Sequence, residues 1–255
     1  MKKTYIIANW KMQLGVEKSV ELFSQIVSNF PEKNKTEVVV CPAYTSLQKV
    51  NELNKDKIVK LGAQDVFWEE SGAYTGEISC EMLKEIGCEY VIIGHSDRRK
   101  YFKEDDEIIH HKAKTALKCS LVPIVCVGET FQERQEGRKD YAIISQVTKA
   151  LSGIKPVGNN KIIIAYEPVW VIGSGQAINA EEAEHMHQVI RQTIVDLFGV
   201  SIMEKNFKII YGGSISKKIV KTFLIQPNID GVLVGGASLK PQEFLGIIEE
   251  AISIK

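Results

Sequence analysis

Long apolar runs and an excess of one charge sign are both missing from this 255-residue sequence. No stretch approaches the roughly 18 consecutive apolar residues that can span a bilayer, so we expect a soluble protein with no membrane partner. The 32 Lys and Arg residues balance the 32 Asp and Glu residues, which leaves no overall positive field for nucleic acid or an acidic membrane. Any anion must therefore be bound by a local site.

Closely paired cysteines are missing too. The five cysteines stand at positions 41, 80, 88, 119 and 126, an odd number without close paired spacing. This pattern argues against a disulfide framework and against a zinc site, and it favours a reducing compartment, the cytoplasm. The apolar run after Lys2-Lys3 is too short for a signal peptide because Asn9 and Lys11 follow at once, so we interpret it as a strand.

The composition present is that of a packed domain, with 44% hydrophobic and 25% charged residues, and we expect one domain over 1–255. Short apolar segments rich in β-branched residues recur along it. They are continuous rather than alternating, which is typical of strands buried on both faces of a parallel sheet. The predicted strands are 4–9, 37–41, 59–63, 90–94, 121–127, 161–166, 207–211 and 230–234.

Segments with helical periodicity separate these strands. The predicted helices are 16–29, 45–54, 79–87, 105–118, 131–153, 180–198, 216–225 and 241–253. Strand and helix alternate with a mean period of roughly 32 residues, which predicts an α/β fold closed into a (β/α)8 barrel, with eight parallel strands surrounded by helices. An open doubly wound sheet is the alternative, but the first strand is not followed by a glycine-rich dinucleotide turn.

Polar residues follow several predicted strands at the point where each strand ends. Because the carboxyl ends of parallel barrel strands share one face, these residues converge although they are distant in the chain. We therefore expect them to form one site. They are Asn9 and Lys11 after the first strand, His95, Ser96 and Asp97 after the fourth, Gly128-Glu129 after the fifth, and Glu167 after the sixth.

Glycine-rich turns, Gly212-Gly213-Ser214 and Gly235-Gly236, follow the last two predicted strands. Missing side chains let backbone N–H groups approach an anion, and a helix N-terminus adds positive potential. A glycine after a strand can also simply turn the chain. Two such turns after consecutive late strands favour a phosphate site, and hence a phosphorylated small molecule as ligand.

The same side chains also have structural interpretations. His95 could be a core histidine, and Glu167 could be a salt-bridge partner of Lys11. A carboxylate at the end of a buried strand, however, costs desolvation energy unless it is paired or catalytic. We interpret Arg98 and Arg99 as the start of a solvated or salt-bridged helix rather than as substrate ligands.

Other clusters are interpreted as structural. His110 and His111 point about 100° apart on a helix, which is poor geometry for sharing a metal, and His185 and His187 have the same problem. Both pairs are expected on solvated helix faces. Cys126 is interpreted as a small core residue.

Short segments spread from the first strand to the last helix resemble the triosephosphate isomerase family. They are Asn9-Trp10-Lys11-Met12, Gly62-Ala63-Gln64, Gly72-Ala73-Tyr74-Thr75-Gly76-Glu77, Ile93-Gly94-His95-Ser96, Cys126-Val127-Gly128-Glu129, Ala165-Tyr166-Glu167-Pro168-Val169-Trp170, Tyr211-Gly212-Gly213-Ser214 and Leu233-Val234-Gly235-Gly236-Ala237-Ser238-Leu239. Any one could be coincidence, but together, in order and at the expected strand ends, they are specific. The resemblance implies a TIM barrel that interconverts dihydroxyacetone phosphate and D-glyceraldehyde 3-phosphate in glycolysis and gluconeogenesis.

The resemblance also implies residue roles. Glu167 would be the base that moves a proton through an enediol(ate) intermediate, and His95 a neutral electrophile. Lys11 would supply positive charge and, with Asn9, contact the substrate. The supporting residues would be Ser96 and Asp97. No metal or organic cofactor is implied.

Backbone N–H groups of four residues would hold the substrate phosphate, namely Gly173, Ser214, Gly235 and Gly236. The segment 168–178 resembles the mobile lid of the family, which excludes water when it closes. The segment 64–78 resembles the dimer loop of the family, with its tip near Thr75. A homodimer is therefore implied.

Some positions depart from the family pattern. Asp97 stands where the family has glutamate, which shortens a carboxylate implied to order Lys11. Gln13 and Asp65 replace asparagines, and Val171 replaces an alanine of the lid. A phosphosugar lyase or synthase and a noncatalytic phosphate-binding protein are the other function classes for this fold. The combination of His95, Lys11 and Glu167 with a complete lid argues against both.

Overall fold

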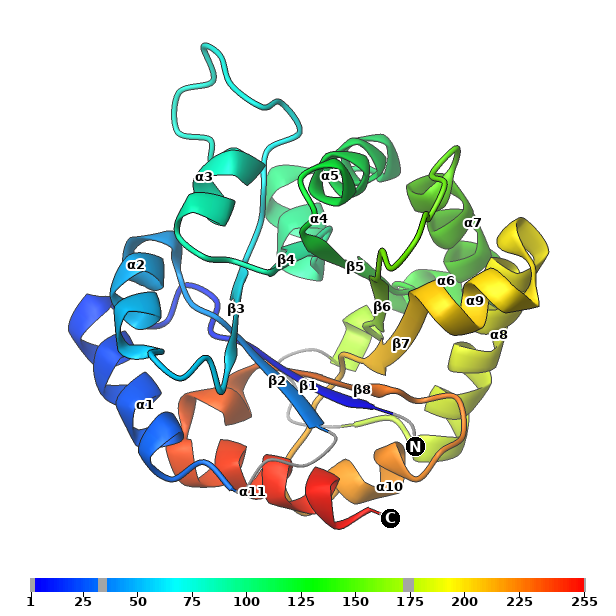
Figure 1. Ribbon diagram of the computed structural model, residues 1–255. Coiled ribbons are helices and arrows are strands. Elements are labelled where there is room, and N and C mark those ends of the chain that lie inside the picture. Colours follow the sequence, from blue (N-terminus) through cyan, green and yellow to red (C-terminus); the bar gives the residue numbers. More distant parts are fainter. Residues whose placement is uncertain (1–2, 32–35, 172–176, 255) are drawn as a thin grey trace.

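The computed structural model describes residues 3–31, 36–171 and 177–254. Its eight strands are parallel and hydrogen-bonded in sequence order, and β8 pairs with β1 to close a barrel (Figure 1). The strands are β1 (Thr4–Asn9), β2 (Thr36–Cys41), β3 (Lys60–Ala63), β4 (Tyr90–Ile93), β5 (Val122–Val127), β6 (Ile162–Tyr166), β7 (Phe207–Tyr211) and β8 (Gly231–Val234). Each predicted strand is confirmed to within one residue at either end.

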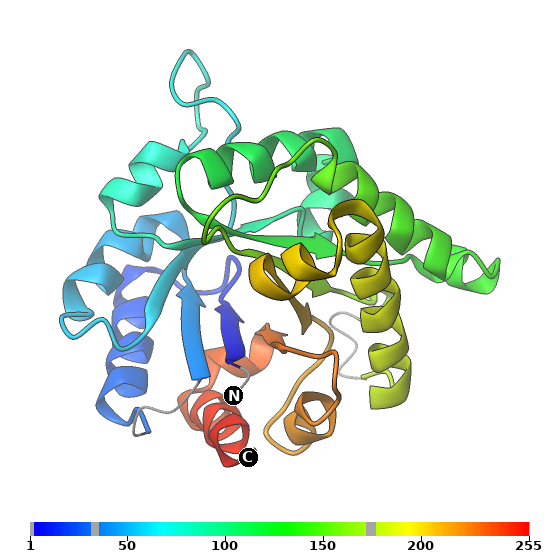
Figure 2. The same cartoon turned by 45° about the vertical axis from the view of Figure 1, so that its right-hand side comes forward.

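Helices surround the barrel on its outside, as the turned view also shows (Figure 2). They are α1 (Val16–Ser28), α2 (Tyr44–Leu53), α3 (Cys80–Glu85), α4 (Ser96–Phe102), α5 (Asp106–Lys118), α6 (Phe131–Gln135), α7 (Lys139–Leu151), α8 (Ala180–Phe198), α9 (Val200–Asn206), α10 (Val220–Leu224) and α11 (Pro241–Ser253), with 3-10 turns η1 (Val169–Val171) and η2 (Gly236–Leu239). The expected (β/α)8 barrel is therefore the observed fold. In the described ranges, no helix has the length and apolar composition needed to cross a bilayer.

The helix prediction differs from the structure in several places, and α10 begins four residues later than the predicted 216–225. The segment 131–153 is two helices, because Gly137 between them has a φ of +71°, which an α-helix does not accommodate. Helix α9 was not predicted, and α4 was anticipated only by the interpretation of Arg98 and Arg99 as the start of a helix. Both have only seven residues, too few to show a clear apolar period.

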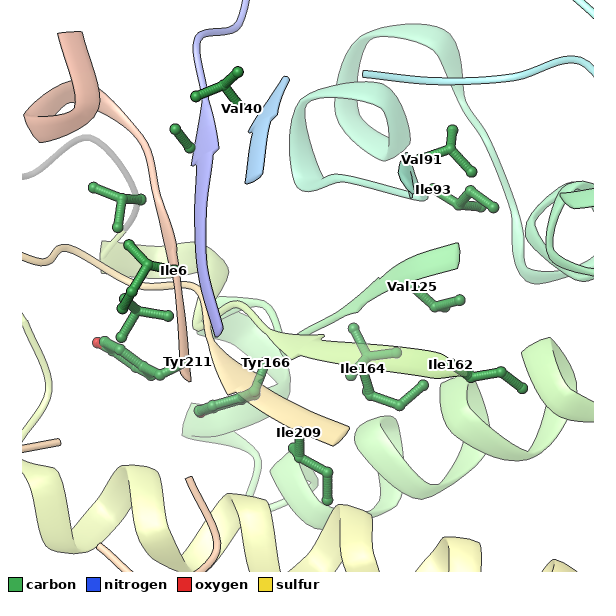
Figure 3. Packing of buried hydrophobic residues seen from close by; sticks show 14 of the residues in the cluster. Ile6, Val40, Val91, Ile93, Val125, Ile162, Ile164, Tyr166, Ile209 and Tyr211 are labelled. Atoms are coloured by element: carbon green, nitrogen blue, oxygen red, sulfur yellow. The ribbon is translucent and has the colours of Figure 1, made fainter. Parts of the chain in front are cut away.

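Two apolar layers follow from the alternation of side chains along each strand. One set points into the barrel and includes Tyr5, Ile7, Ile163 and Ala165. The intervening residues pack between the strands and the helices, as Figure 3 shows for side chains of β1, β2 and β4 to β7. Because successive residues of a strand point to opposite faces, residues two positions beyond the inward set also face the barrel interior.

The absence of disulfides expected from the cysteine spacing was wrong. Cys80, the first residue of α3, forms a disulfide with Cys119, which directly follows α5. Their Cα atoms are 6.2 Å apart, within the usual range for such a bond. The two segments meet because α3 and α5 lead into the neighbouring strands β4 and β5. The two cysteines are 39 residues apart in the sequence, so their spacing did not indicate that they lie close together in the fold.

The expected solvated position of His187 was also wrong. This side chain is fully buried on α8, with its Nδ1 2.7 Å from the Ala183 carbonyl oxygen and its ring edge-on to Tyr166. Burial lowers its pKa to about 4. His185, two residues earlier, is exposed as expected. Helix α8 therefore buries His187, although the acidic residues near it in the sequence suggested a solvated position.

This burial makes stability depend on pH. Because the folded-state pKa of His187 lies below the unfolded value of 6.5, the unfolded chain takes up a proton first as pH falls. His187→Gln should therefore reduce the loss of unfolding free energy between pH 7.5 and 4.5 by about 2–3 kcal/mol, measured by urea unfolding at both values. His185→Gln is the matched control and should leave the pH dependence unchanged. Equal pH dependence in wild type and His187→Gln would contradict the assignment.

Candidate active site

An open cavity of about 440 Å³ lies at the carboxyl ends of the strands. Its lining comes from the segments that follow β1, β4, β6, β7 and β8. The lining residues include Asn9, Trp10, Lys11, His95, Glu167, Gly212, Ser214, Gly235 and Gly236. The structure therefore brings together the expected polar residues of three strands with both glycine-rich turns.

Glu167 reaches this cavity because it continues the inward-facing series of β6, two residues after Ala165. Its side chain is 3% exposed. The Ser96 backbone N–H donates to Oε2 at 3.1 Å, and His95 Nε2 lies 3.2 Å from Oε1. The Ser96 hydroxyl, by contrast, makes no hydrogen bond within the described part of the chain. Ser96 thus supports the carboxylate through its backbone.

Two glycines leave room for Glu167. A Cβ on Gly128 would lie 1.7 Å from the Glu167 carbonyl oxygen, which no side chain could accommodate. A Cβ on Gly212 would lie 2.8 Å from Glu167 Cγ. The Gly212 backbone N–H also donates to the Tyr166 carbonyl at 2.7 Å, which brings the end of β7 against that of β6. Sequence reasoning assigned no such packing role to Gly128 or Gly212.

His95 is held in one tautomer by its place as the N-cap of α4. Its Nδ1 accepts a hydrogen bond of 3.0 Å from the Asp97 backbone N–H. An accepting ring nitrogen carries no proton, so the neutral ring has its N–H at Nε2, the nitrogen that faces Glu167. Asp97 Oδ2 is farther from Nδ1, at 3.5 Å, and could form an ion pair only with a protonated ring. His95 can therefore donate into the cavity.

Lys11 follows β1 in the left-handed region, with a φ of +51°. Asn9 and Gln64 stabilise this unusual backbone. Asn9 Oδ1 accepts from the Lys11 N–H at 3.0 Å, and Gln64 Nε2 donates to the Lys11 carbonyl at 2.8 Å and to the Cys41 carbonyl at 3.0 Å. Gln64 is a supporting residue that sequence reasoning did not assign, although it lies in a matching segment.

The ammonium of Lys11 pairs with Asp97, whose Oδ2 lies 3.1 Å from Nζ. The sequence also allowed a salt bridge between Lys11 and Glu167, but the structure pairs Lys11 with Asp97 instead. The shorter Asp97 side chain still reaches Lys11. Consequently the cavity holds a carboxylate beside a neutral imidazole, and an ammonium whose counter-charge comes from another residue.

Glu129 does not line the cavity, so its grouping with the site residues was wrong. It is fully buried, and its Oε1 accepts from Trp170 Nε1 at 2.9 Å and from the Tyr166 hydroxyl at 3.2 Å. Burial raises the pKa of this carboxyl. The Arg134 guanidinium lies 4.6 Å from the Trp170 ring centroid. These contacts hold the first turn of the segment expected to be a lid.

The remaining residues divide between the site and its support. Ser214, Gly235 and Gly236 line the cavity as expected, whereas Gly173 and the central part of the segment 168–178 lie outside the described residues. The structural interpretation of two arginines is confirmed. Arg98 pairs with Asp65 and Glu104, and Arg99 pairs with Asp106.

Cys126 is a buried core residue, as expected. Burial raises the pKa of its thiol, and the nearby negative charge of Glu167 raises it further. Trp10 is a further cavity residue that sequence reasoning did not single out, and its side chain is 1% exposed. Its position in the sequence, between Asn9 and Lys11, is the feature from which it could have been identified.

Comparison with known proteins identifies the family of this chain. The family model for triosephosphate isomerase matches residues 4–251. The triosephosphate isomerase of Dictyoglomus turgidum is 46% identical over 251 residues, which cover 97% of this chain and 99% of that protein. Those of Alkaliphilus oremlandii and Clostridium tetani are 45% and 41% identical over 248 residues, covering 97% of this chain and 99% and 96% of the respective relatives. By this full-length similarity, carried on a closed barrel with the expected cavity, the chain belongs to the triosephosphate isomerase family.

Proposed function

We propose that this protein catalyses the reversible conversion of dihydroxyacetone phosphate into D-glyceraldehyde 3-phosphate, the isomerisation used in glycolysis and gluconeogenesis. One observation carries the proposal. Glu167, His95 and Lys11 line one cavity together with Ser214 and the Gly235-Gly236 turn. A small molecule that carries both a carbonyl group and a phosphate fits this combination of an acid–base pair, an ammonium and glycine-rich turns.

Glu167 acts as the base in this proposal. It removes a proton from the carbon next to the substrate carbonyl, which leaves an enediol(ate), and it returns the proton to the neighbouring carbon. The same group works in both directions because substrate and product differ only in the position of the carbonyl. Oε2 can accept the substrate proton once it gives up its hydrogen bond from the Ser96 backbone N–H.

His95 and Lys11 stabilise the oxygen on which negative charge develops. The Nε2–H of His95 donates to that oxygen, and a neutral ring can pass the proton between the two substrate oxygens. The Lys11 ammonium supplies charge in a partly water-excluded site, where electrostatic stabilisation is strongest. Asn9 and Asp97 position Lys11 through its backbone N–H and its Nζ, respectively.

The phosphate lies against the turns after β7 and β8 in this proposal. Gly236 would have no atom within 4 Å of an added Cβ, so the turn leaves open space for a ligand. Gly173 joins Ser214, Gly235 and Gly236 as a phosphate ligand, and the segment 168–178 closes over the substrate to exclude water. Trp170, anchored to Glu129, sets where that closure begins.

A homodimer formed through the loop 64–78 is also part of this proposal, with the cytoplasm as its location. This loop projects from the barrel between β3 and α3 (Figure 1). Large apolar side chains are exposed on several elements of the first 102 residues, which supports a partner there. They include Met12, Tyr44, Tyr74, Met82, Tyr101 and Phe102.

Removing the proposed base should abolish most activity. Glu167→Gln keeps the shape and the Ser96 hydrogen bond but cannot accept the proton, so turnover should fall by about 10²- to 10⁴-fold in a coupled assay with each triose phosphate. Glu136→Gln, on an exposed residue, should retain full activity. Unchanged turnover in Glu167→Gln would overturn the mechanism.

Substitutions beside Glu167 and in the proposed phosphate site should have different effects on kcat and KM. Gly212→Ala places a methyl group against Glu167 Cγ, so we expect kcat to fall by about 10- to 100-fold with little change in KM. Gly236→Ala occupies the open space of the proposed phosphate site, so we expect KM to rise more than kcat falls. A rise in KM for Gly212→Ala together with a fall in kcat for Gly236→Ala would contradict the roles assigned to these two parts of the cavity.

Dimerisation should depend on the projecting loop. Thr75→Arg should convert a sedimenting dimer into a monomer and reduce activity at least tenfold, because a buried unpaired charge at an interface is unfavourable. Thr222→Arg, at an exposed position of α10, is the control and should leave both properties unchanged. A fully active wild-type monomer would refute the dimer.

A further inference from the structure

One face of α5 holds the outgoing arm of the loop 64–79. Lys112 Nζ lies 2.8 Å from both carboxylate oxygens of Asp65. Three residues later, the Thr115 hydroxyl donates to the Trp68 carbonyl at 2.8 Å. Three residues later again, Lys118 forms an ion pair with Glu70. This spacing keeps all three contacts on one side of the helix.

The returning arm of the loop is held at the end of the same helix. Cys119 directly follows α5, and its disulfide partner Cys80 is the first residue after the loop. Within the loop, the Phe67 N–H donates to the Ile78 carbonyl at 2.9 Å and joins the two arms. The disulfide is therefore the covalent link between α5 and the returning arm.

These contacts differ in how easily they can be lost. The side chains of Lys112 and Asp65 are 2% and 4% exposed, so this pair is shielded from water and salt. The Lys118–Glu70 pair is mostly exposed, and such pairs contribute little. Cys80 is fully buried, but Cys119 is only half-buried. Cys119 is therefore the more accessible of the two linked cysteines.

We propose that Cys80 and Cys119 form a reversible redox link that orders the loop 64–79 and thereby controls dimer affinity. The effect on affinity rests on the proposed dimer. The proposed cytoplasmic location also bears on it, since disulfides of cytosolic proteins are usually transient and redox-responsive.

The chemistry is thiol–disulfide exchange with a low-molecular-weight thiol. Its thiolate attacks Cys119 Sγ, forms a mixed disulfide and releases Cys80 as a thiolate. A second thiolate attacks the external sulfur and releases Cys119, so two small thiols become one small disulfide. The electrons that reduce the protein come from these two thiols, and each cysteine thiolate then takes up a proton. Oxidation by a low-molecular-weight disulfide reverses both steps.

The other cysteines provide an internal control for this exchange. Cys41, Cys88 and Cys126 lie outside the disulfide and are each at most 1% exposed. Glu81 and the two linked sulfurs place potential metal-ligand atoms within 4.8 Å of one another. Measurements should therefore be made in a chelator, so that no bound cation replaces the disulfide after reduction.

The test compares the oxidised and reduced wild-type chain. Reduction should speed amide hydrogen exchange in peptides covering 66–79 while β6 stays protected, because the Phe67–Ile78 bond opens more often. The protein concentration at which specific activity falls on dilution should rise about tenfold, with equal turnover at high concentration. Identical exchange in the two redox states would overturn the proposal.

Variants separate this inference from the proposed function. Cys80→Ser with Cys119→Ser should match the reduced protein under oxidising conditions, whereas Cys88→Ala should still respond to reduction. Should the oxidised chain lack isomerase activity, the proposed function fails, and hydrogen exchange still decides whether the disulfide orders the loop. Faster exchange without any shift in the dilution midpoint would overturn the control of dimer affinity.

Discussion

The alternation of side chains in a closed parallel barrel is the constraint on which the site depends. Tyr5 and Ile7 point inward on β1, and Ile163 and Ala165 do so on β6. The next members of these series are Asn9 and Glu167, which stand where the strands end and the cavity begins. A shift of one residue in either strand would turn these polar groups toward the helices, where burial without partners is costly. Core packing and site geometry are therefore specified together.

The distribution of charge within the site follows from that arrangement. Glu167 meets a backbone N–H and a neutral imidazole, whereas Lys11 meets Asp97. The ion pair of Lys11 and Asp97 is partly exposed, whereas Glu167 is buried and needs to exchange only one hydrogen bond from a backbone amide for another contact, which costs little. The carboxylate can therefore change partners when substrate enters, while Lys11 keeps its counter-charge. Asp97 pairs with Lys11 although its side chain is shorter than that of the glutamate expected from the family.

Features set by local pattern were predictable from the sequence, and features set by contacts between distant segments were not. Continuous apolar segments predicted the strands, and the residues just beyond them predicted His95, Lys11 and Glu167 as one site. Glu129 follows a strand too, yet its carboxylate accepts a hydrogen bond from Trp170, which comes from the turn after a different strand, β6. His187 looked solvated beside its acidic neighbours, but α8 packs that position against Tyr166. The disulfide depends on the adjacency of β4 and β5, which cysteine spacing does not encode.

The loop 64–79 contacts the site through its first residues. Gln64 bonds the Lys11 carbonyl, and the next residue, Asp65, is held by buried Lys112. The disulfide lies at the opposite end of the loop, after its tip. In the proposed redox link, opening the disulfide would free the tip and the returning arm while the buried anchor at Asp65 keeps Gln64 in place. A change in redox state would then reach the site through the proposed assembly with a second copy, rather than through distortion of Lys11 within one chain.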